Sequence, residues 1–252
     1  MPKFHFAAVI QDQEEIPRFA RGLPLHEVWL RGTMLNMPRA QGASRLHEQL
    51  RRRLPKNARL GLYAWHYLTH RQGDALPGRG TRTLQVDAES GACGHLQDTS
   101  VCGAALDASV RALRELGGGA LILATPSSMT PGVLGRQRLR SFLDRCEPLD
   151  LEIVWEPTGL WTVPDVLSAV RDTSARGVLA ETDLRGDSPV ADRSWVRVGG
   201  GGQAVHLSNA QAESLAFRLV DCFEGDTARV VFSGPRAFSN LRSFQKAIAL
   251  MA

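Results

Sequence analysis

The sequence predicts a single α/β domain folded as a (β/α)8 TIM barrel, and three observations lead to this prediction. The length of 252 residues is typical of one such barrel. Apolar runs of strand length alternate with segments of helical periodicity along the whole chain, as they do in parallel sheets. Several of these runs are apolar without interruption, which is expected where a strand is buried on both faces.

Eight segments qualify as strands because each is a short, mostly apolar run between turn or helical segments. The run Ala120–Ala124 is the clearest, since it contains only Ala, Leu and Ile. The full set is Phe4–Ile10, Glu27–Leu30, Leu60–Trp65, Ala120–Ala124, Leu151–Trp155, Gly177–Ala180, Trp195–Val198 and Arg229–Phe232.

The helices between these strands are marked by apolar stripes at helical spacing and by residues that favour helix ends. Ser208 and Gln211 form a capping box at the start of one helix, and Pro235 suits the first turn of the last one. The other helices are expected at 43–54, 103–116, 134–146 and 163–172.

Two connections interrupt this alternation. Residues 71–100 form a long, polar, Gly-rich insertion between the third strand and its helix, and residues 183–193 contain no convincing helix. The helix after strand six is therefore expected to be missing or irregular. Loops of this length in a compact domain are usually functional or disordered. We interpret residues 1–252 as one domain that carries 71–100 as an insertion.

The composition is that of a globular protein, with 43% apolar and 22% charged residues. No apolar stretch reaches the roughly 20 residues that a membrane-spanning helix needs, and polar residues follow Met1 too soon for a secretory signal. We therefore expect a cytoplasmic protein without a membrane partner. The net charge of +4 is too small to predict nucleic-acid binding, and Arg51–Arg53 is interpreted as the solvated end of an amphipathic helix.

The four cysteines are scattered and form no C-x-x-C pair. Cys146 and Cys222 lie near the ends of predicted helices, where buried thiols are common. Cys93 and Cys102 lie in a Gly-rich stretch, so a metal or cluster site there is the alternative to ordinary free thiols.

The functional site of a TIM barrel lies at the carboxyl ends of its strands. Because the third strand is expected to end near Trp65, Thr69 and His70 should lie over the opening. The residues at or just after the predicted strand ends are Gln11, Arg31, His66, Thr69, His70, Thr125, Ser127, Glu156, Glu181, Asp183, Arg197, Gly199 and Ser233.

One group within this set could ligate a divalent metal ion, since neutral imidazole and carboxylate are suitable ligands. The spacing is not diagnostic, because the two histidines are expected on a loop. Hydrogen-bonded histidines and surface carboxylates are the alternative interpretation. The group consists of His66, His70, Glu156, Glu181 and Asp183.

A second group could bind an anion without hydrolysing it. Gly199–Gly202 follows strand seven, while Ser233 and Gly234 precede Arg236 at the start of the last helix. Many TIM barrels bind phosphate in these two loops through backbone N–H groups and a helix N-terminus. Arg236 could add a charge-assisted hydrogen bond. The alternative is a Gly-rich loop beside a solvated arginine.

The tryptophans all fall in or just beyond predicted strands, where core packing is the expected role. Trp161 is the best candidate for a position at the mouth, where it could stack on a sugar or a base. No Gly-x-Ser-x-Gly elbow, P-loop or dinucleotide fingerprint is present. The five tryptophans are Trp29, Trp65, Trp155, Trp161 and Trp195.

Several segments, in order along the chain, resemble the YecE-like proteins of unknown function, which are TIM barrels. The family's "VELNSTFYRLP" is similar to Val28–Pro38, its "ITH" to Leu68–His70, its "QLPPSF" to Ala124–Met129, its "YVRLHG" to Trp195–Gly200, its "YSDEEL" to His206–Gln211 and its "FFNN" to Val231–Gly234.

The chain departs from that family at most of its polar positions. The family's lysine on strand three falls at Tyr63, its strand-four glutamine at Ala124 and the histidine of "RLHG" at Gly199. Its paired asparagines fall at Ser233 and Gly234, and its opening "GTSGWSY" is missing. The resemblance thus implies a divergent member that keeps the apolar frame.

From these losses we expect a non-catalytic or degenerate barrel that has no metal or other cofactor and binds a protein partner or a small anionic ligand. The alternative is a metal-assisted hydrolase or isomerase acting on a phosphoester or sugar, since the barrel resembles those of xylose-isomerase and endonuclease-four type. The residues expected to bind the ligand are Arg31, Thr69, His70, Glu156, Asp183, Arg197, Gly199, Gly200, Ser233 and Arg236.

Overall fold

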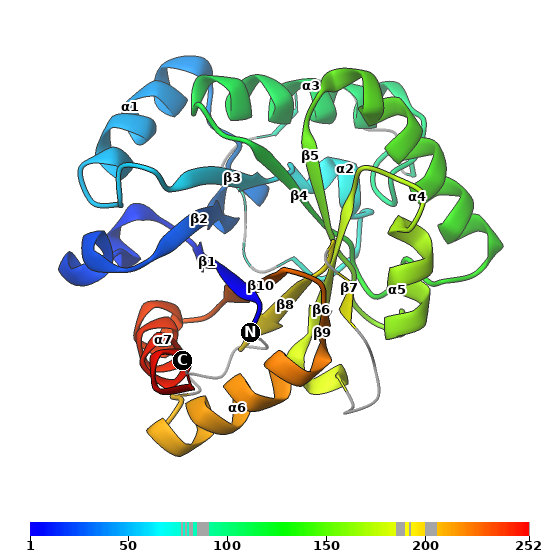
Figure 1. Cartoon of the computed structure of the whole chain (residues 1–252). Helices are drawn as coiled ribbons and strands as arrows, with labels where there is room; N and C mark the ends of the chain where they lie inside the picture. Colours follow the sequence, from blue (N-terminus) through cyan, green and yellow to red (C-terminus); the bar gives the residue numbers. More distant parts are fainter. Residues whose placement is uncertain are drawn as a thin grey trace.

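The computed structural model describes residues 1–76, 78, 80, 83–84, 91–184, 190–191, 193–199 and 206–251. Its main sheet is a closed barrel of eight strands in the order β1-β10-β8-β6-β5-β4-β3-β2 (Figure 1). Every neighbouring pair is parallel, including the pair β1 and β10 that closes the ring. The predicted (β/α)8 barrel is therefore confirmed.

The strands of the barrel agree with the predicted runs to within two residues at each end. The third strand differs most visibly, because it ends at Tyr63 and not at Trp65. The barrel strands are β1 Lys3–Ile10, β2 Leu25–Leu30, β3 Arg59–Tyr63, β4 Ala120–Ala124, β5 Glu152–Glu156, β6 Arg176–Ala180, β8 Trp195–Val198 and β10 Thr227–Phe232. A separate two-stranded sheet pairs β7 Val190–Ala191 with β9 Phe223–Glu224.

The helices surround the barrel, and the capping box of Ser208 and Gln211 starts one of them as predicted. The last helix begins one residue after Arg236, so that Arg236 precedes it. The helices are α1 Ala40–Arg51, α2 His66–Thr69, α3 Ser100–Glu115, α4 Val133–Cys146, α5 Val163–Val170, α6 Asn209–Cys222 and α7 Ala237–Met251. No described helix is both long enough and apolar enough to cross a membrane.

The irregular connections lie where the sequence indicates them. In the described residues between β6 and β8 there is a 3-10 turn, Glu181–Asp183, but no α-helix. The described part of 71–99 contains no helix or strand, and α3 begins at Ser100. Between β1 and β2 the chain forms two 3-10 segments, Gln13–Glu15 and Arg18–Gly22.

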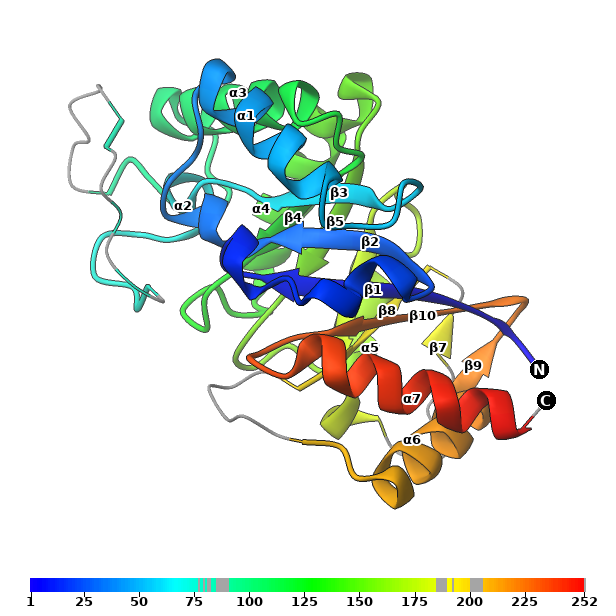
Figure 2. The same cartoon turned by 90° about the vertical axis from the view of Figure 1, so that its left-hand side faces the viewer.

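Figure 2 shows the barrel from the side, with the carboxyl ends of β1 and β2 pointing toward α2 and both chain termini at the opposite end. Alternate side chains of each strand point into the barrel. The interior cluster includes Ala7, Trp29, Tyr63, Val154 and Trp195, and a larger cluster fills the space between sheet and helices.

The same alternation and the strand register continue the interior cluster into a polar layer at each end of the barrel. At the amino ends this layer contains His5, Glu27, Arg59, Glu152, Arg176 and Arg229. At the carboxyl ends it contains Arg31, Tyr63, Glu156, Arg197 and Ser233, together with Ala124 and Ala180. This second layer forms the mouth at which the ligand is expected.

Candidate functional site at the barrel mouth

Three side chains from three strands meet at the centre of the mouth. The hydroxyl of Tyr63 donates a hydrogen bond to Oε2 of Glu156 at 2.6 Å, and Nη1 of Arg197 donates to Oε1 of the same carboxylate. Glu156 is buried, and a buried carboxylate is tolerated when it is paired and hydrogen-bonded in this way. The strand ends therefore hold this carboxylate in one position.

Burial and the negative charge of Glu156 raise the pKa of Tyr63 well above its ordinary value. The phenol consequently stays protonated at neutral pH and acts as a donor. Tyr63 is therefore not the group that releases a proton at this centre near neutral pH.

A second guanidinium lies beside this centre. Cζ of Arg31 is 5.9 Å from the centroid of the Tyr63 ring. Nε of Arg31, Nε of Arg197 and Oγ of Ser233 are buried and make no hydrogen bond within the part of the chain that the structure describes. The mouth thus has two guanidinium groups for one carboxylate and leaves donors unsatisfied, as expected of a site for an anion.

The first residues of the insertion lie over the mouth. Leu76 packs against the interior cluster that contains Met34 and Tyr63. Asp74, two residues earlier, accepts a hydrogen bond of 2.6 Å from Oγ of Ser128, in the loop after β4. These two contacts attach the start of the insertion to the mouth.

His95 completes the attachment of the insertion. Its Nε2 lies 2.9 Å from Oγ of Ser128 and 3.3 Å from Oδ2 of Asp74. Burial alone would raise the pKa of Asp74, but hydrogen bonds from Ser128 and from the Arg71 amide hold it below its ordinary value. Since both contacts of His95 use Nε2, the trio differs from a catalytic triad, in which the histidine uses both ring nitrogens.

Thr69 and His70 lie beyond the end of β3, at the base of the insertion. Oγ1 of Thr69 and Nδ1 of His70 are 2.8 Å apart, and both residues are buried. Burial lowers the pKa of His70 to about 4, so that its imidazole is neutral near pH 7. Arg31 is close enough to contribute to this lowering, which places the pair beside the charged centre.

A cleft runs outward from Arg197 between the loops after β5 and β6. Its inner part, of about 180 Å³, is lined by Thr158, Asp183 and Arg197. An outer part of about 580 Å³ continues past Trp161 and Leu160. The indole of Trp161 donates a hydrogen bond of 2.6 Å to the Met129 carbonyl. Asp183 and Arg197 thus share one solvent-connected space.

The five residues of the proposed metal group do not come together, so that hypothesis is wrong for this set. Nδ1 of His66 is 3.0 Å from the Met34 carbonyl, and Glu181 pairs with Arg218 on α6 at 2.5 Å. Glu156 is held by hydrogen bonds from Tyr63 and Arg197. Among the described residues, no group of three or more His, Cys, Asp or Glu side chains is placed to hold a metal ion.

The predicted anion site between strands seven and eight is only partly described. Gly199 has a positive φ of 79°, and the Ser233 amide donates to the Val198 carbonyl at 3.0 Å. Gly200 and the following glycines lie outside the described residues. Arg236 is exposed on the turn before α7, where no hydrogen bond or ion pair holds its side chain in the described structure. Its predicted role in anion binding therefore lacks structural support.

The remaining candidates have structural roles or are exposed. Thr125 accepts a hydrogen bond of 3.1 Å from the indole of Trp155, while Gln11 and Ser127 are exposed. All four cysteines are buried and free, as the thiol interpretation expects. Core packing is confirmed for the four tryptophans that are fully buried, and Trp161 reaches the mouth cleft; the four are Trp29, Trp65, Trp155 and Trp195.

Tyr63 lies at the centre of the mouth but was not among the predicted site residues. The signal for it was present, because Arg59, Gly61 and Tyr63 alternate along one strand and the last of them stands at its carboxyl end. Leu76, Asp74 and His95 were also missed. They carry no local motif, and their positions depend on the path of the insertion.

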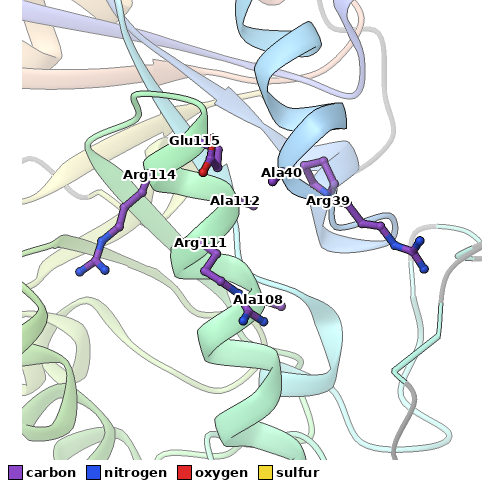
Figure 3. Close-up of a pocket in the computed structure, with 8 residues that line it drawn as sticks. Arg39, Ala40, Ala108, Arg111, Ala112, Arg114 and Glu115 are labelled. Atoms are coloured by element: carbon purple, nitrogen blue, oxygen red, sulfur yellow. The ribbon is translucent and has the colours of Figure 1, made fainter.

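A groove of about 350 Å³ between α1 and α3 lies away from the mouth (Figure 3). Its floor is formed by Ala40, Ala108 and Ala112, and Figure 3 shows the side chains of Arg39 and Arg114 pointing away from each other. No polar groups converge in this groove, so it has no features of a chemical site.

Comparisons with known proteins agree with the fold. No family model matches the chain, and no curated protein matches it. A DUF72 family protein from Enterococcus faecalis has a similar structure, with a TM-score of 0.66, 13% identity and coverage of 99% of this chain and 98% of that one.

Two other solved structures carry enzyme names. A xylose isomerase domain containing protein from Salmonella typhimurium has a TM-score of 0.55, 10% identity and coverage of 98% of this chain and 97% of that one. For endonuclease IV from Thermus thermophilus the TM-score is 0.52 and the identity 14%, with 99% and 100% coverage. At identities this low, the structural similarity shows a shared barrel fold and does not extend to function.

Proposed function

We propose that the protein is an enzyme that acts on a small anionic sugar or phosphoester at the barrel mouth, with Glu156 as its acid–base group. The observation that carries this proposal is the buried Glu156 carboxylate, which Tyr63 and Arg197 hold at the carboxyl end of the barrel. Catalytic carboxylates in TIM barrels occupy this end of the strands.

Arg31 and Arg197 bind the anionic group of the substrate in this proposal. Their buried Nε atoms make no hydrogen bond to any residue that the structure describes, and a phosphate or carboxylate oxygen satisfies such donors well. Oγ of Ser233 is a further unsatisfied group in the same layer. Asp183 faces the cleft that Arg197 lines, where it can accept hydrogen bonds from substrate hydroxyl groups.

Glu156 then accepts a proton from the bound substrate and returns it at another atom or to a leaving group. Tyr63 stays protonated and keeps its hydrogen bond to the carboxylate, so it fixes the position of Glu156. General acid–base catalysis of this kind increases a reaction rate by a factor of about 10²–10⁴. The cleft that Arg197 lines gives the substrate a path from solvent to this end of the barrel.

The named activities of the structural neighbours favour an enzyme over the non-catalytic barrel that the lost polar positions indicated. They include a xylose isomerase domain and an endonuclease, which are directed at a sugar and at nucleic acid. The described residues offer no metal-ligand group, so the proposed proton transfer uses the protein's own carboxylate. Membership of the YecE-like family, a cytoplasmic location and a protein partner stay predictions.

Isothermal titration calorimetry with a panel of pentose and hexose phosphates tests the binding step, followed by product analysis by NMR. We expect at least one compound to bind, with about tenfold or greater weakening in Arg31→Ala and no change in Arg114→Ala, which lies in the α1–α3 groove. Glu156→Gln should retain binding and lose at least about 100-fold in turnover.

Two results would contradict the proposal in different ways. Binding without turnover by the wild-type protein would identify a binding protein that uses the same mouth. Binding that Arg31→Ala leaves unchanged would place the ligand elsewhere.

A further inference from the structure

A strongly basic cleft lies on the outer flank of the barrel. It has a volume of about 580 Å³, and Ile16, Pro17, Arg18, Arg21, Arg52 and Arg53 line it. The arginines come from two segments far apart in the sequence, the 3-10 segment before β2 and the end of α1. Figure 1 shows these two segments on the same flank, in dark and light blue.

The charge in this cleft is unbalanced. Four guanidinium groups line it and no carboxylate does. Some arginines outside this cleft are paired with carboxylates, as in Arg136–Asp165 and Arg218–Glu181. In the described ranges none of the four cleft arginines forms an ion pair. Guanidinium groups that line the same cleft repel one another, and an anion bound in the cleft reduces that repulsion.

The end of helix α1 accounts for the positions of only two of the four arginines. Arg52 and Arg53 interact favourably with the negative end of the α1 dipole, an effect confined to the last turn. Arg18 and Arg21 belong to another segment and gain nothing from it. Nη1 of Arg53 donates a hydrogen bond of 2.8 Å to the Gln13 carbonyl, which connects the two sides of the cleft.

We propose that this cleft binds a compact polyanion that carries at least two phosphate groups. Guanidinium groups recognise phosphate through paired hydrogen bonds, and four of them match the charge of a diphosphate or triphosphate. The volume is within the range of small-molecule sites. Nucleic acid is less suited, because its backbone requires a stripe of charge along a surface and these arginines line a single cleft.

Titration calorimetry with inorganic pyrophosphate at low salt tests the proposal. The double variant Arg21→Ala/Arg52→Ala should bind pyrophosphate at least about tenfold more weakly than the wild type, because hydrogen bonds to a charged group are lost from both sides of the cleft. The matched control, Arg111→Ala/Arg114→Ala, removes the same charge from the α1–α3 groove and should change the affinity less than about twofold. All four side chains are exposed, so both variants should fold.

The outcomes separate this cleft from the mouth. Loss of pyrophosphate binding in Arg31→Ala with retention in Arg21→Ala/Arg52→Ala would assign the probe to the mouth and overturn the proposal. Equal weakening of pyrophosphate binding in the two double variants would show a diffuse charge effect and would overturn the proposal. Absence of binding heat in the wild type would overturn it as well. Tighter binding of a short DNA duplex, with a steep salt dependence, would identify a nucleic-acid surface in its place.

Discussion

The two ends of the barrel interior both carry charged side chains, yet they use them differently. At the amino end Glu152 lies between two arginines, 2.6 Å from Nε of Arg176 and 3.3 Å from Nη1 of Arg59, and Arg59 also reaches Glu27 at 4.0 Å. His5 also lies 3.4 Å from Oε1 of Glu27, and Arg229 belongs to the same layer, so both amino-end carboxylates are held by contacts within the protein. At the carboxyl end Arg197 holds Glu156 and Arg31 lies beside Tyr63. Three buried polar atoms there have no hydrogen-bond partner among the described residues, against one, Nε2 of His5, at the amino end.

This difference indicates that the amino end is a structural plug and the carboxyl end a binding site. Glu27 also accepts a hydrogen bond of 2.9 Å from the Trp29 indole, so its carboxylate is fully used within the protein. Between the two ends, the rings of Trp29 and Trp195 meet edge to face at 4.9 Å and fill the barrel. The ends can therefore be altered separately, which the following predictions use.

The largest expected effect is on stability at the amino end. Glu27→Ala should lower the free energy of unfolding by about 3 kcal/mol, because it leaves the buried Trp29 indole without its acceptor and removes the buried carboxylate that also contacts His5. Urea denaturation measures this loss. Anion binding at the mouth should not change. Loss of both stability and anion binding in this variant would show that the two ends of the barrel are coupled.

The acid sensitivity of the mouth should be somewhat smaller. Burial lowers the pKa of His70 from 6.5 to about 4, so between these values the unfolded chain binds a proton that the folded protein does not. Stability should therefore fall as the pH decreases from about 6.5 to 4, by at most about 3 kcal/mol, and should not depend on this group above 6.5. His70→Gln should flatten the dependence measured by urea denaturation across that range. An unchanged slope would assign the acid sensitivity to other groups.

Glu156→Gln should change stability by only about 1 kcal/mol, since the amide oxygen still accepts one of the two hydrogen bonds. The same variant removes the only negative charge of the described mouth centre. Calorimetry should consequently show phosphate binding that is as tight as in the wild type or tighter. Weaker binding would mean that Glu156 contacts the ligand through its charge.

The smallest expected effect concerns Leu76, which is only partly buried over the mouth. Leu76→Ala should cost less than about 1 kcal/mol of stability, because little apolar area is removed from water. Because Leu76 packs against the interior cluster at the mouth, stopped-flow measurement should show faster ligand association in this variant. Leu250→Ala, at an exposed position near the end of α7, provides the control and should leave the association rate unchanged.

The barrel itself could be predicted because its strands are continuous apolar runs that local sequence identifies. The same information placed Arg31, Glu156 and Arg197 at strand ends, and the register brings all three into one layer. Tyr63 was missed because the apolar run continues through Ala64 and Trp65, whereas the strand ends at Tyr63 and a helical turn begins at His66. Periodicity alone does not separate the end of a strand from an apolar turn.

Contacts between distant segments could not be predicted in the same way. Asp74 and Ser128 are 54 positions apart, and only the folded path of the insertion brings them together. Arg52 and Arg53 are exposed, as the sequence indicated, but the structure places them opposite Arg18 and Arg21. A run of like charge that looks solvated in sequence becomes one side of a cleft in the fold.

The pairing of β1 with β10 also determines when the barrel can form during synthesis. Residues 3–8 find their partners at 227–232, so the ring stays open until nearly the whole chain has left the ribosome. Until then β1 and β8 present unpaired backbone N–H and C=O groups, which other chains can capture. We expect the nascent protein to be most prone to aggregation just before β10 emerges, and its yield to depend on how quickly this last strand is delivered.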